Sequence, residues 1–89
     1  MSPYFLEFHE DWHYYFGKLD NSVKKQIMKK VMQLQNPLPA RHLKFGLDFY
    51  VEDVGQYRIC YKIDETRQAK VFYFAGTHKE YEKWLGMLG

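Results

Sequence analysis

Two side chains in the C-terminal half of the sequence have the types and settings that phosphate chemistry needs. Arg58 lies in a segment of alternating apolar and polar residues, so its side chain is expected on the face opposite the apolar ones. A guanidinium group on an open sheet face can bind phosphate through two parallel hydrogen bonds. His78 ends the last apolar run, where a histidine can donate or accept a proton near neutral pH. The simpler alternatives are an ion pair between Arg58 and, for example, Glu52, and an exposed or helix-capping histidine.

Aromatic and basic residues extend this candidate site. Lys62 shares its expected face with Arg58. Tyr81 and Trp84 follow His78 within two helical turns, and either ring has the flat face needed to stack on a nucleobase. A tryptophan among apolar helix residues more often belongs to the core, so stacking and packing both stay open for these rings.

A run of lysines earlier in the chain is a second candidate for contact with nucleic acid. Lysines on one helix face commonly form an ordinary solvated surface, and they can also neutralise phosphates. Both interpretations stay open, and Lys24 and Lys25 are the members that we assign to substrate binding. The run consists of Lys18, Lys24, Lys25, Lys29 and Lys30.

The segment His9-Glu10-Asp11-Trp12-His13 matches the H-E-x-x-H pattern of zinc hydrolases. In that pattern two histidines on one helix face bind the metal, and the glutamate acts as a base. Here the motif falls at an expected strand-to-helix junction, and a third ligand would have to come from His42, His78 or an acid. The alternative is a solvated first helical turn with acids near its positive end.

Length and composition limit the classes of protein. The 89 residues form one expected domain, 1–89, and 46% of them are hydrophobic and 19% aromatic. A net charge of +2 with this apolar content excludes disorder, and no apolar run is long enough for a membrane span. The single Cys60 cannot form an internal disulfide and is expected to be a reduced packing residue. With no signal peptide at the N-terminus, a cytoplasmic location is the expectation.

The N-terminal half is predicted to be a short strand followed by two helices. The strand spans residues 4–8, and the first helix spans residues 10–18. Asp20, Asn21 or Ser22 can cap the second helix, which ends before two prolines because proline lacks an amide proton. Apolar residues of this helix recur every three to four positions and form one stripe: Val23, Ile27, Val31 and Leu34.

The C-terminal half changes to the two-residue period of strands. Strands are predicted over residues 43–51, 57–63 and 70–75, with a hairpin turn at Gly55, and a helix over 79–87 closes the chain. The predicted order is β-α-α-β-β-β-α. This order favours an α+β fold, in which a small antiparallel sheet carries the two N-terminal helices on one face and a short C-terminal helix.

The chain resembles the RelE/ParE superfamily of type II toxins along nearly its whole length. The resemblance rests on the order and spacing of three segments, which are Arg41-His42-Leu43-Lys44, Gly55-Gln56-Tyr57-Arg58-Ile59-Cys60-Tyr61-Lys62 and Val71-Phe72-Tyr73-Phe74-Ala75-Gly76-Thr77-His78-Lys79-Glu80-Tyr81. It implies a RelE-like fold and an endoribonuclease that cleaves mRNA on the ribosome and represses translation. It also implies an antitoxin partner that wraps the toxin and neutralises it, and no metal or other cofactor.

The resemblance also implies roles for single residues in the attack of a ribose 2′-OH on the adjacent phosphodiester. Arg58 matches the arginine that stabilises the phosphate, and His78 matches the proposed acid or base. Tyr81 or Trp84 matches the C-terminal aromatic that orients or stacks the base. Lys44 lies near a lysine or glutamate position of the family's second strand, and Glu52 is a second candidate base. A ParE-like inhibitor of gyrase and an inactive antitoxin-binding module are the alternatives.

Overall fold

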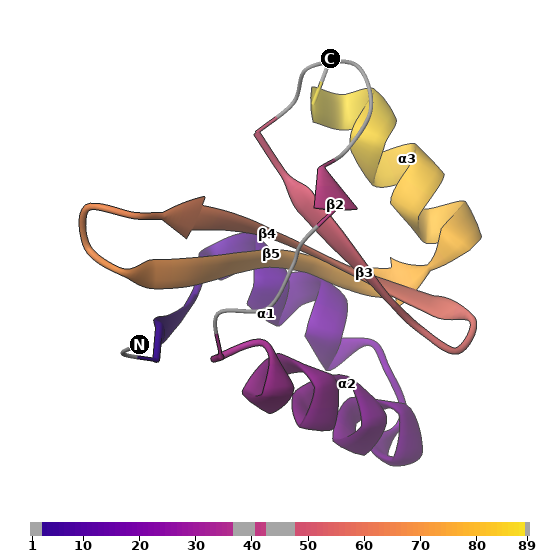
Figure 1. Ribbon diagram of the computed structural model, residues 1–89. Helices are drawn as coiled ribbons and strands as arrows, with labels where there is room; N and C mark the ends of the chain where they lie inside the picture. The colour runs from indigo at the N-terminus through magenta and orange to yellow at the C-terminus, as the bar shows by residue number, and fades with distance from the viewer. Residues whose placement is uncertain (1–2, 37–40, 43–47, 89) are drawn as a thin grey trace.

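The computed structural model describes residues 3–36, 41–42 and 48–88 of the chain, as Figure 1 shows. The element order agrees with the predicted β-α-α-β-β-β-α, with a two-residue strand added before the first long hairpin strand. The elements are β1 (Phe5–Phe8), α1 (Glu10–Gly17), α2 (Asn21–Gln33), β2 (Arg41–His42), β3 (Tyr50–Val54), β4 (Tyr57–Asp64), β5 (Ala69–Thr77) and α3 (His78–Leu88).

The five strands form one sheet in the order β1-β5-β4-β3-β2. Neighbouring strands are antiparallel except at one edge, where β1 runs parallel to β5. The sheet is therefore mixed rather than wholly antiparallel. The strand predicted over residues 43–51 is described only in part, because residues 43–47 lie outside the described part of the chain, and β3 runs on to Val54.

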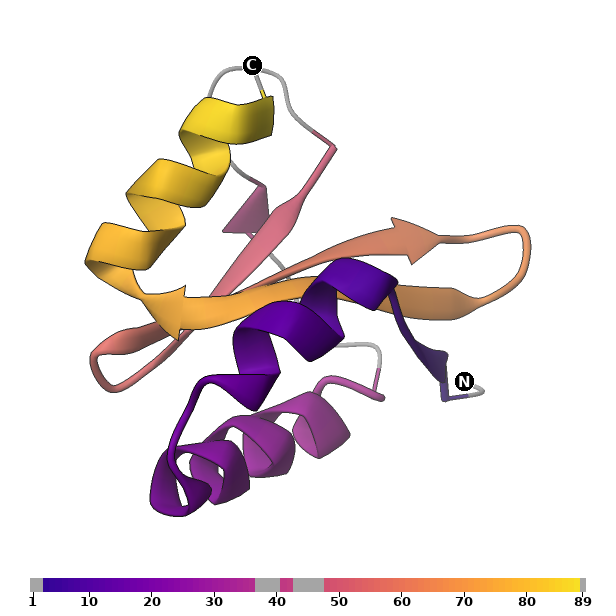
Figure 2. The same ribbon diagram turned by 180° about the vertical axis from the view of Figure 1, so that it is seen from behind.

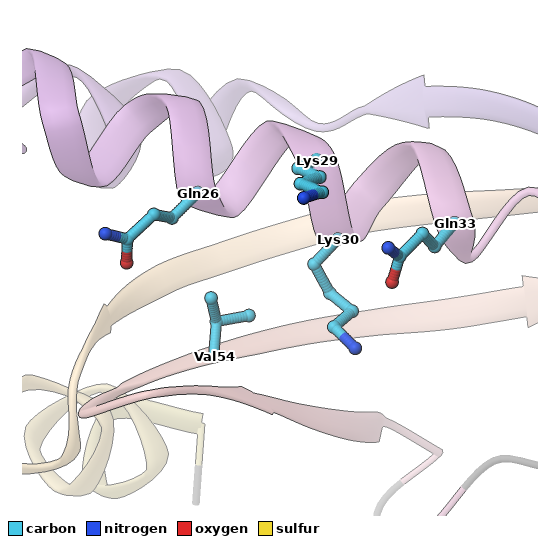
Figure 3. A pocket seen from close by; sticks show the side chains of 5 residues that line it. All are labelled: Gln26, Lys29, Lys30, Gln33 and Val54. Carbon is cyan, nitrogen blue, oxygen red and sulfur yellow. The ribbon is translucent and has the colours of Figure 1, made fainter.

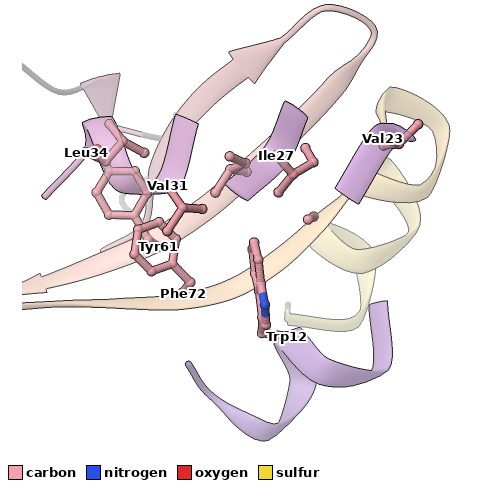
Figure 4. Close-up of a cluster of buried hydrophobic side chains, with 9 residues drawn as sticks. Trp12, Val23, Ile27, Val31, Leu34, Tyr61 and Phe72 are labelled. Atoms are coloured by element: carbon pink, nitrogen blue, oxygen red, sulfur yellow. The ribbon is translucent and has the colours of Figure 1, made fainter. Parts of the chain in front are cut away.

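Helices α1 and α2 pack together on one face of the sheet, as predicted (Figures 1 and 2). The apolar stripe of α2 is buried there, and Trp12 of α1 packs against Phe72 of β5 with ring centroids 5.7 Å apart. Figure 4 shows this cluster between the helices and the sheet. Each fully buried aliphatic or aromatic side chain contributes about 1.5–3 kcal/mol, so this layer provides much of the folding free energy.

Both ends of α2 are fixed by side chains. The Oδ1 atom of Asp20 accepts hydrogen bonds from the amide of Val23 (3.0 Å) and the hydroxyl of Ser22 (2.8 Å). At the other end the Nζ of Lys70, a residue only 1% exposed, donates to the carbonyls of Leu34 (2.6 Å) and Asn36 (3.1 Å). Burial lowers the pKa of Lys70, and the negative charges of Glu65 and Glu52 oppose this shift.

The second face of the sheet is covered by α3, which corrects the expectation of an open face beneath Arg58. Cys60 of β4 and Phe74 of β5 are fully buried there, together with Trp84 of α3. Phe74 and Trp84 are stacked at 5.1 Å. The packing role expected for Cys60 is confirmed, and burial strongly raises the pKa of its thiol, so it stays protonated.

Two irregularities in the sheet matter for the site. Gly55 adopts a positive φ of 59° in the two-residue turn between β3 and β4, a conformation that glycine tolerates best. In β5 an extra residue, Tyr73, lies between the partners of Tyr61 and Cys60 and forms a β-bulge.

Among the described residues, no helix has the length and hydropathy needed to cross a bilayer.

Candidate active site

Arg58 is held across the β3–β4 hairpin by an acidic residue. Because the Gly55-Gln56 turn has two residues, Asp53 stands directly opposite Arg58 in the antiparallel ladder. The Nε of Arg58 donates to Oδ1 of Asp53 at 2.9 Å. The side chains keep 27% and 40% exposure, respectively, so the pair remains accessible to an incoming phosphate. The ion pair considered for Arg58 thus exists, with Asp53 rather than Glu52.

Tyr81 of α3 provides the surface against which the guanidinium packs. The Cζ atom of Arg58 lies 4.7 Å from the centroid of the Tyr81 ring, a cation–π contact. Tyr81 is only 6% exposed, and burial raises the pKa of its phenol, so the hydroxyl is protonated at neutral pH. The ring therefore positions Arg58 and is too buried to stack on a base, which corrects the stacking role.

His78 is brought to the same place by the junction between β5 and α3. Thr77 and Glu80 form a reciprocal capping box: the amide of Thr77 donates to Oε1 of Glu80 (2.9 Å), and the amide of Glu80 donates to Oγ1 of Thr77 (3.2 Å). This box fixes His78 as the first residue of α3. Gly76 is required beside it, because a Cβ there would lie 2.8 Å from Phe74 and 3.0 Å from the Glu80 carboxylate.

One carboxylate oxygen connects the three groups. Oδ1 of Asp53 lies 3.8 Å from Nε2 of His78 as well as 2.9 Å from Nε of Arg58. A histidine and a carboxylate can each accept or donate a proton, and an arginine can stabilise negative charge on phosphorus. These residues come from β3, β4 and the start of α3, and they place an acid, a base and a fixed cation within one small surface. We call Asp53, Arg58 and His78, with Tyr81 beneath them, the candidate site.

Sequence reasoning missed Asp53, although the sequence holds a signal for it. A two-residue turn at Gly55-Gln56 pairs Val54 with Tyr57 and therefore Asp53 with Arg58. Glu52, the predicted candidate base, points to the opposite face, since successive strand residues alternate. There its carboxylate approaches Nζ of Lys30 on α2 at 4.0 Å.

The other predicted residues that the structure describes do not join this cluster. Lys62 lies on the same face of β4 as Arg58, about 13 Å away along the strand at ~3.3 Å per residue. Its Nζ sits 4.8 Å from the centroid of the Phe49 ring. Trp84 is 2% exposed and belongs to the core, which corrects its assignment to substrate binding. Lys44 lies outside the described residues.

The lysines of α2 belong to the other face of the molecule. Helix α2 packs on the face of the sheet opposite α3, so Lys24 and Lys25 are not part of the candidate site. Their assignment to substrate binding stays a prediction for that other face. A pocket of about 270 Å³ opens between α2 and β3 near this lysine surface, as Figure 3 shows. Its lining consists of Gln26, Lys29, Lys30, Gln33 and Val54.

The H-E-x-x-H segment does not have the geometry of a zinc site. His9 is the N-cap of α1, with an extended backbone, and its Nδ1 accepts a hydrogen bond from the amide of Asp11 (3.1 Å). Its ring stacks on Tyr73 at 4.5 Å. Because His9 precedes the helix, it does not share a helix face with His13. Across the described ranges, no cluster of three or more potential ligands is placed to hold a metal ion.

Of the comparisons with known proteins, the one with solved structures finds matches. No family model matches the sequence, and no curated protein matches it. Among solved structures, a chain of the RelBE2 toxin–antitoxin complex from Mycobacterium tuberculosis superposes with a TM-score of 0.78 at 20% identity, covering 88% of this chain and 94% of that one. A mutant of the Escherichia coli toxin RelE in the free state gives 0.74 at 26% identity, covering 92% and 90%.

Two further solved structures are similar to this chain in fold. The isolated E. coli RelE toxin gives a TM-score of 0.72 at 22% identity and covers 97% of this chain and 99% of that one. A chain of the intact E. coli RelBE complex gives 0.70 at 25% identity, covering 83% and 95%. In all four comparisons, 83% or more of this chain and 90% or more of the other chain are covered. The chain has the fold of the RelE toxins.

Proposed function

We propose that this protein is the toxin of a type II toxin–antitoxin system and that it cleaves mRNA on the ribosome. The observation that carries the proposal is the convergence of Asp53, Arg58 and His78 on a RelE fold. Several of the similar structures are toxins in complex with a RelB antitoxin, which supports an antitoxin as the protein partner. The target molecules, the ribosome and mRNA, place the activity in the cytoplasm.

The proposed reaction needs only side chains of this chain. The carboxylate of Asp53 takes the proton of a ribose 2′-OH, and the 2′-oxygen attacks the adjacent phosphorus. Arg58 stabilises the negative charge that develops on the phosphorane oxygens. His78 donates a proton to the departing 5′-oxygen, so the products are a 2′,3′-cyclic phosphate and a 5′-hydroxyl. An incoming phosphate therefore has to replace Asp53 as the partner of Arg58.

Expression with a matched arginine pair tests the proposal. Induced wild-type protein should arrest growth, and purified protein should cut mRNA on programmed ribosomes. The R58A variant should lose cleavage by about 10²-fold or more, as removal of a charge-stabilising donor does. The R67A variant is the control, because Arg67 is also ion-paired, with Glu7 and Asp64, but lies outside the candidate site.

The second candidate function is binding without cleavage, either as a ParE-like gyrase inhibitor or as an inactive antitoxin-binding module. The favouring observation is that the carboxylate of Asp53 already neutralises the cation of Arg58. Growth arrest with intact transcripts on ribosomes, unchanged by R58A, would support this function and overturn the endonuclease.

A further inference from the structure

Helix α3 lies over one end of the second sheet face, and the end nearer the β4–β5 turn is not covered by a described helix. The turn extends away from α3 in both views (Figures 1 and 2). Cys60 and Phe74, beneath α3, are fully buried. Lys62 and Tyr73 lie on the same face, nearer the turn, and both side chains are partly exposed. This end of the sheet has no role in the chemistry described above.

Three aromatic rings are held together there. The rings of His9 and Tyr73 are stacked, with centroids 4.5 Å apart and planes inclined by 22°, and Phe49 meets Tyr73 edge-on at 5.1 Å. The bond from the Asp11 amide to Nδ1 of His9 fixes the imidazole as the N-cap of α1. Its side chain is 38% exposed. Because Tyr73 covers one face of the imidazole, the accessible part is the opposite face, on which a nucleobase can stack.

Lys62 adds a positive charge beside these rings. Its Nζ lies 4.8 Å from the centroid of Phe49 and 5.5 Å from that of Tyr73, so the rings hold the ammonium group in place. Within the described part of the chain, Lys62 forms no ion pair with a carboxylate. Its charge is therefore available to a phosphate. An exposed ring next to an available cation is the combination with which proteins bind single-stranded nucleic acid.

This aromatic surface continues the face that carries the candidate site. Arg58 and Lys62 point to the same side of β4 and lie about 13 Å apart along the strand, at ~3.3 Å per residue. At ~3.4 Å per stacked nucleotide, about four nucleotides or fewer cover that distance. One RNA strand can therefore contact both places.

We propose that His9 and Lys62 bind a second nucleotide of the RNA strand whose scissile phosphodiester lies at Arg58. The base of this nucleotide stacks on the imidazole of His9, which Tyr73 supports from behind, and its phosphate contacts the ammonium group of Lys62. Because stacking accepts any base, the contact favours an unpaired strand without reading its sequence. The inference rests on the proposed function, which makes RNA the substrate, and it adds a contact away from the cleaved bond.

Binding of RNA by histidine and lysine variants of the full chain tests the inference. The probe is a fluorescent single-stranded RNA of about ten nucleotides, fully 2′-O-methylated so that it cannot be cleaved, and affinity is measured by anisotropy. The H9N variant keeps a good N-cap and loses the ring, and it should bind about fivefold more weakly or worse. The K62Q variant should also bind more weakly, and the slope of log affinity against log salt should fall by about 1.

Two controls separate stacking from a general loss of structure or charge. H13N removes an exposed histidine from α1 and should bind RNA as the wild type does. An abasic oligonucleotide of equal length keeps the phosphates and has no base to stack. Wild type and H9N should therefore bind it equally well, whereas K62Q should still bind it more weakly.

The inference is overturned if the wild type does not bind the RNA, if H9N binds it as tightly as the wild type, or if H13N weakens binding as much. It is also overturned if the deficit of H9N persists with the abasic probe, or if H9N and K62Q weaken binding only of the protein encoded by the adjoining reading frame. Cleavage of mRNA on ribosomes is measured separately. Cleavage by the wild type without an effect of H9N on RNA binding would leave the proposed function and remove the inference. RNA binding that depends on His9, without any cleavage, would do the reverse.

Discussion

The carboxylate of Asp53 and the guanidinium of Arg58 face each other across the β3–β4 hairpin, with Oδ1 and Nε 2.9 Å apart. The same oxygen lies 3.8 Å from Nε2 of His78. In the free protein Asp53 is therefore bound to the group that the proposed reaction needs for the phosphate. The pairing holds Arg58 in place and also competes with substrate, and the two effects can be separated by substitution.

Replacing Asp53 by Asn preserves the size of the side chain and removes its negative charge. We expect the D53N variant to cleave mRNA on ribosomes about 10²-fold more slowly or worse, because a general base contributes about 10²–10⁴-fold. It should also bind a non-cleavable RNA more tightly, because Arg58 loses its competing carboxylate. Single-turnover cleavage and fluorescence anisotropy measure the two quantities. D64N, which removes an ion-pair partner of Arg67, should change neither. Wild-type cleavage by D53N would remove Asp53 from the mechanism.

The proposed role of His78 as an acid predicts the direction of the pH dependence. A histidine can donate a proton only while it is protonated, so the cleavage rate should fall as the pH rises. The H78Q variant should be slow and should lack this decline. Rates measured from pH 5.5 to 8.5 under single-turnover conditions check the expectation. A wild-type rate that does not change over this range would contradict it.

The capping box links the stability of α3 to the position of His78. Replacing Glu80 by Ala removes the acceptor for the Thr77 amide and hydroxyl. We expect a loss of about 1 kcal/mol in the free energy of unfolding, the usual cost of a lost helix cap. The E80Q variant retains an acceptor oxygen and should recover most of the loss, as denaturant titration would show. Equal destabilisation by E80A and E80Q would indicate that the charge of Glu80, rather than its hydrogen bonds, is what matters.

The N-cap of α2 predicts part of the acid response. Hydrogen bonds from the Val23 amide and the Ser22 hydroxyl lower the pKa of Asp20 below its ordinary value of 3.8. The folded state therefore favours the ionised form, so this contribution is present above about pH 4 and is lost as pH falls through the lowered pKa. The D20N variant keeps a good N-cap without a titrating group. Its thermal midpoint should match wild type at pH 7 and fall less on acidification to pH 2.5.

The matched carboxylate control for this measurement is E82Q, in which an exposed acid of α3 is removed. Thermal midpoints of wild type, D20N and E82Q are followed by circular dichroism over the same pH series. A decline in D20N as steep as that of the wild type would show that the cap does not contribute to the acid response.

Local patterns predicted the elements well because each is set by neighbours in sequence. The apolar stripe of α2 could be predicted from its period of three to four residues. The alternation in β4 could be predicted from a period of two. The parallel pairing of β1 with β5 joins residues more than sixty positions apart, for example Phe5 and Ala69, and no local pattern specifies it. Lys70 illustrates the same limit, because its burial depends on the carbonyls at the end of α2.

The candidate site was predicted to the extent that it depends on single strands. Arg58 and His78 lie beside the same carboxylate, and their catalytic roles stay predictions. Predicting that Asp53 lies beside Arg58 would have required the pairing of β3 with β4, which the turn at Gly55 determines. The burial of Trp84 could not be predicted without knowing which face of the sheet α3 covers. Helix periodicity alone does not distinguish packing on the sheet from exposure to RNA.

The bulge at Tyr73 has a consequence for how sequences of this fold compare. Tyr61 pairs with Phe72 and Cys60 pairs with Phe74, so Tyr73 is one residue more than the ladder needs. Removing it would leave Phe72 and Phe74 on opposite faces, in phase with β4, and would leave Gly76 opposite Arg58. A one-residue gap at Tyr73 in an alignment would therefore keep the histidine in register with the arginine. Alignments that place the gap elsewhere in β5 would match the wrong residues across the site.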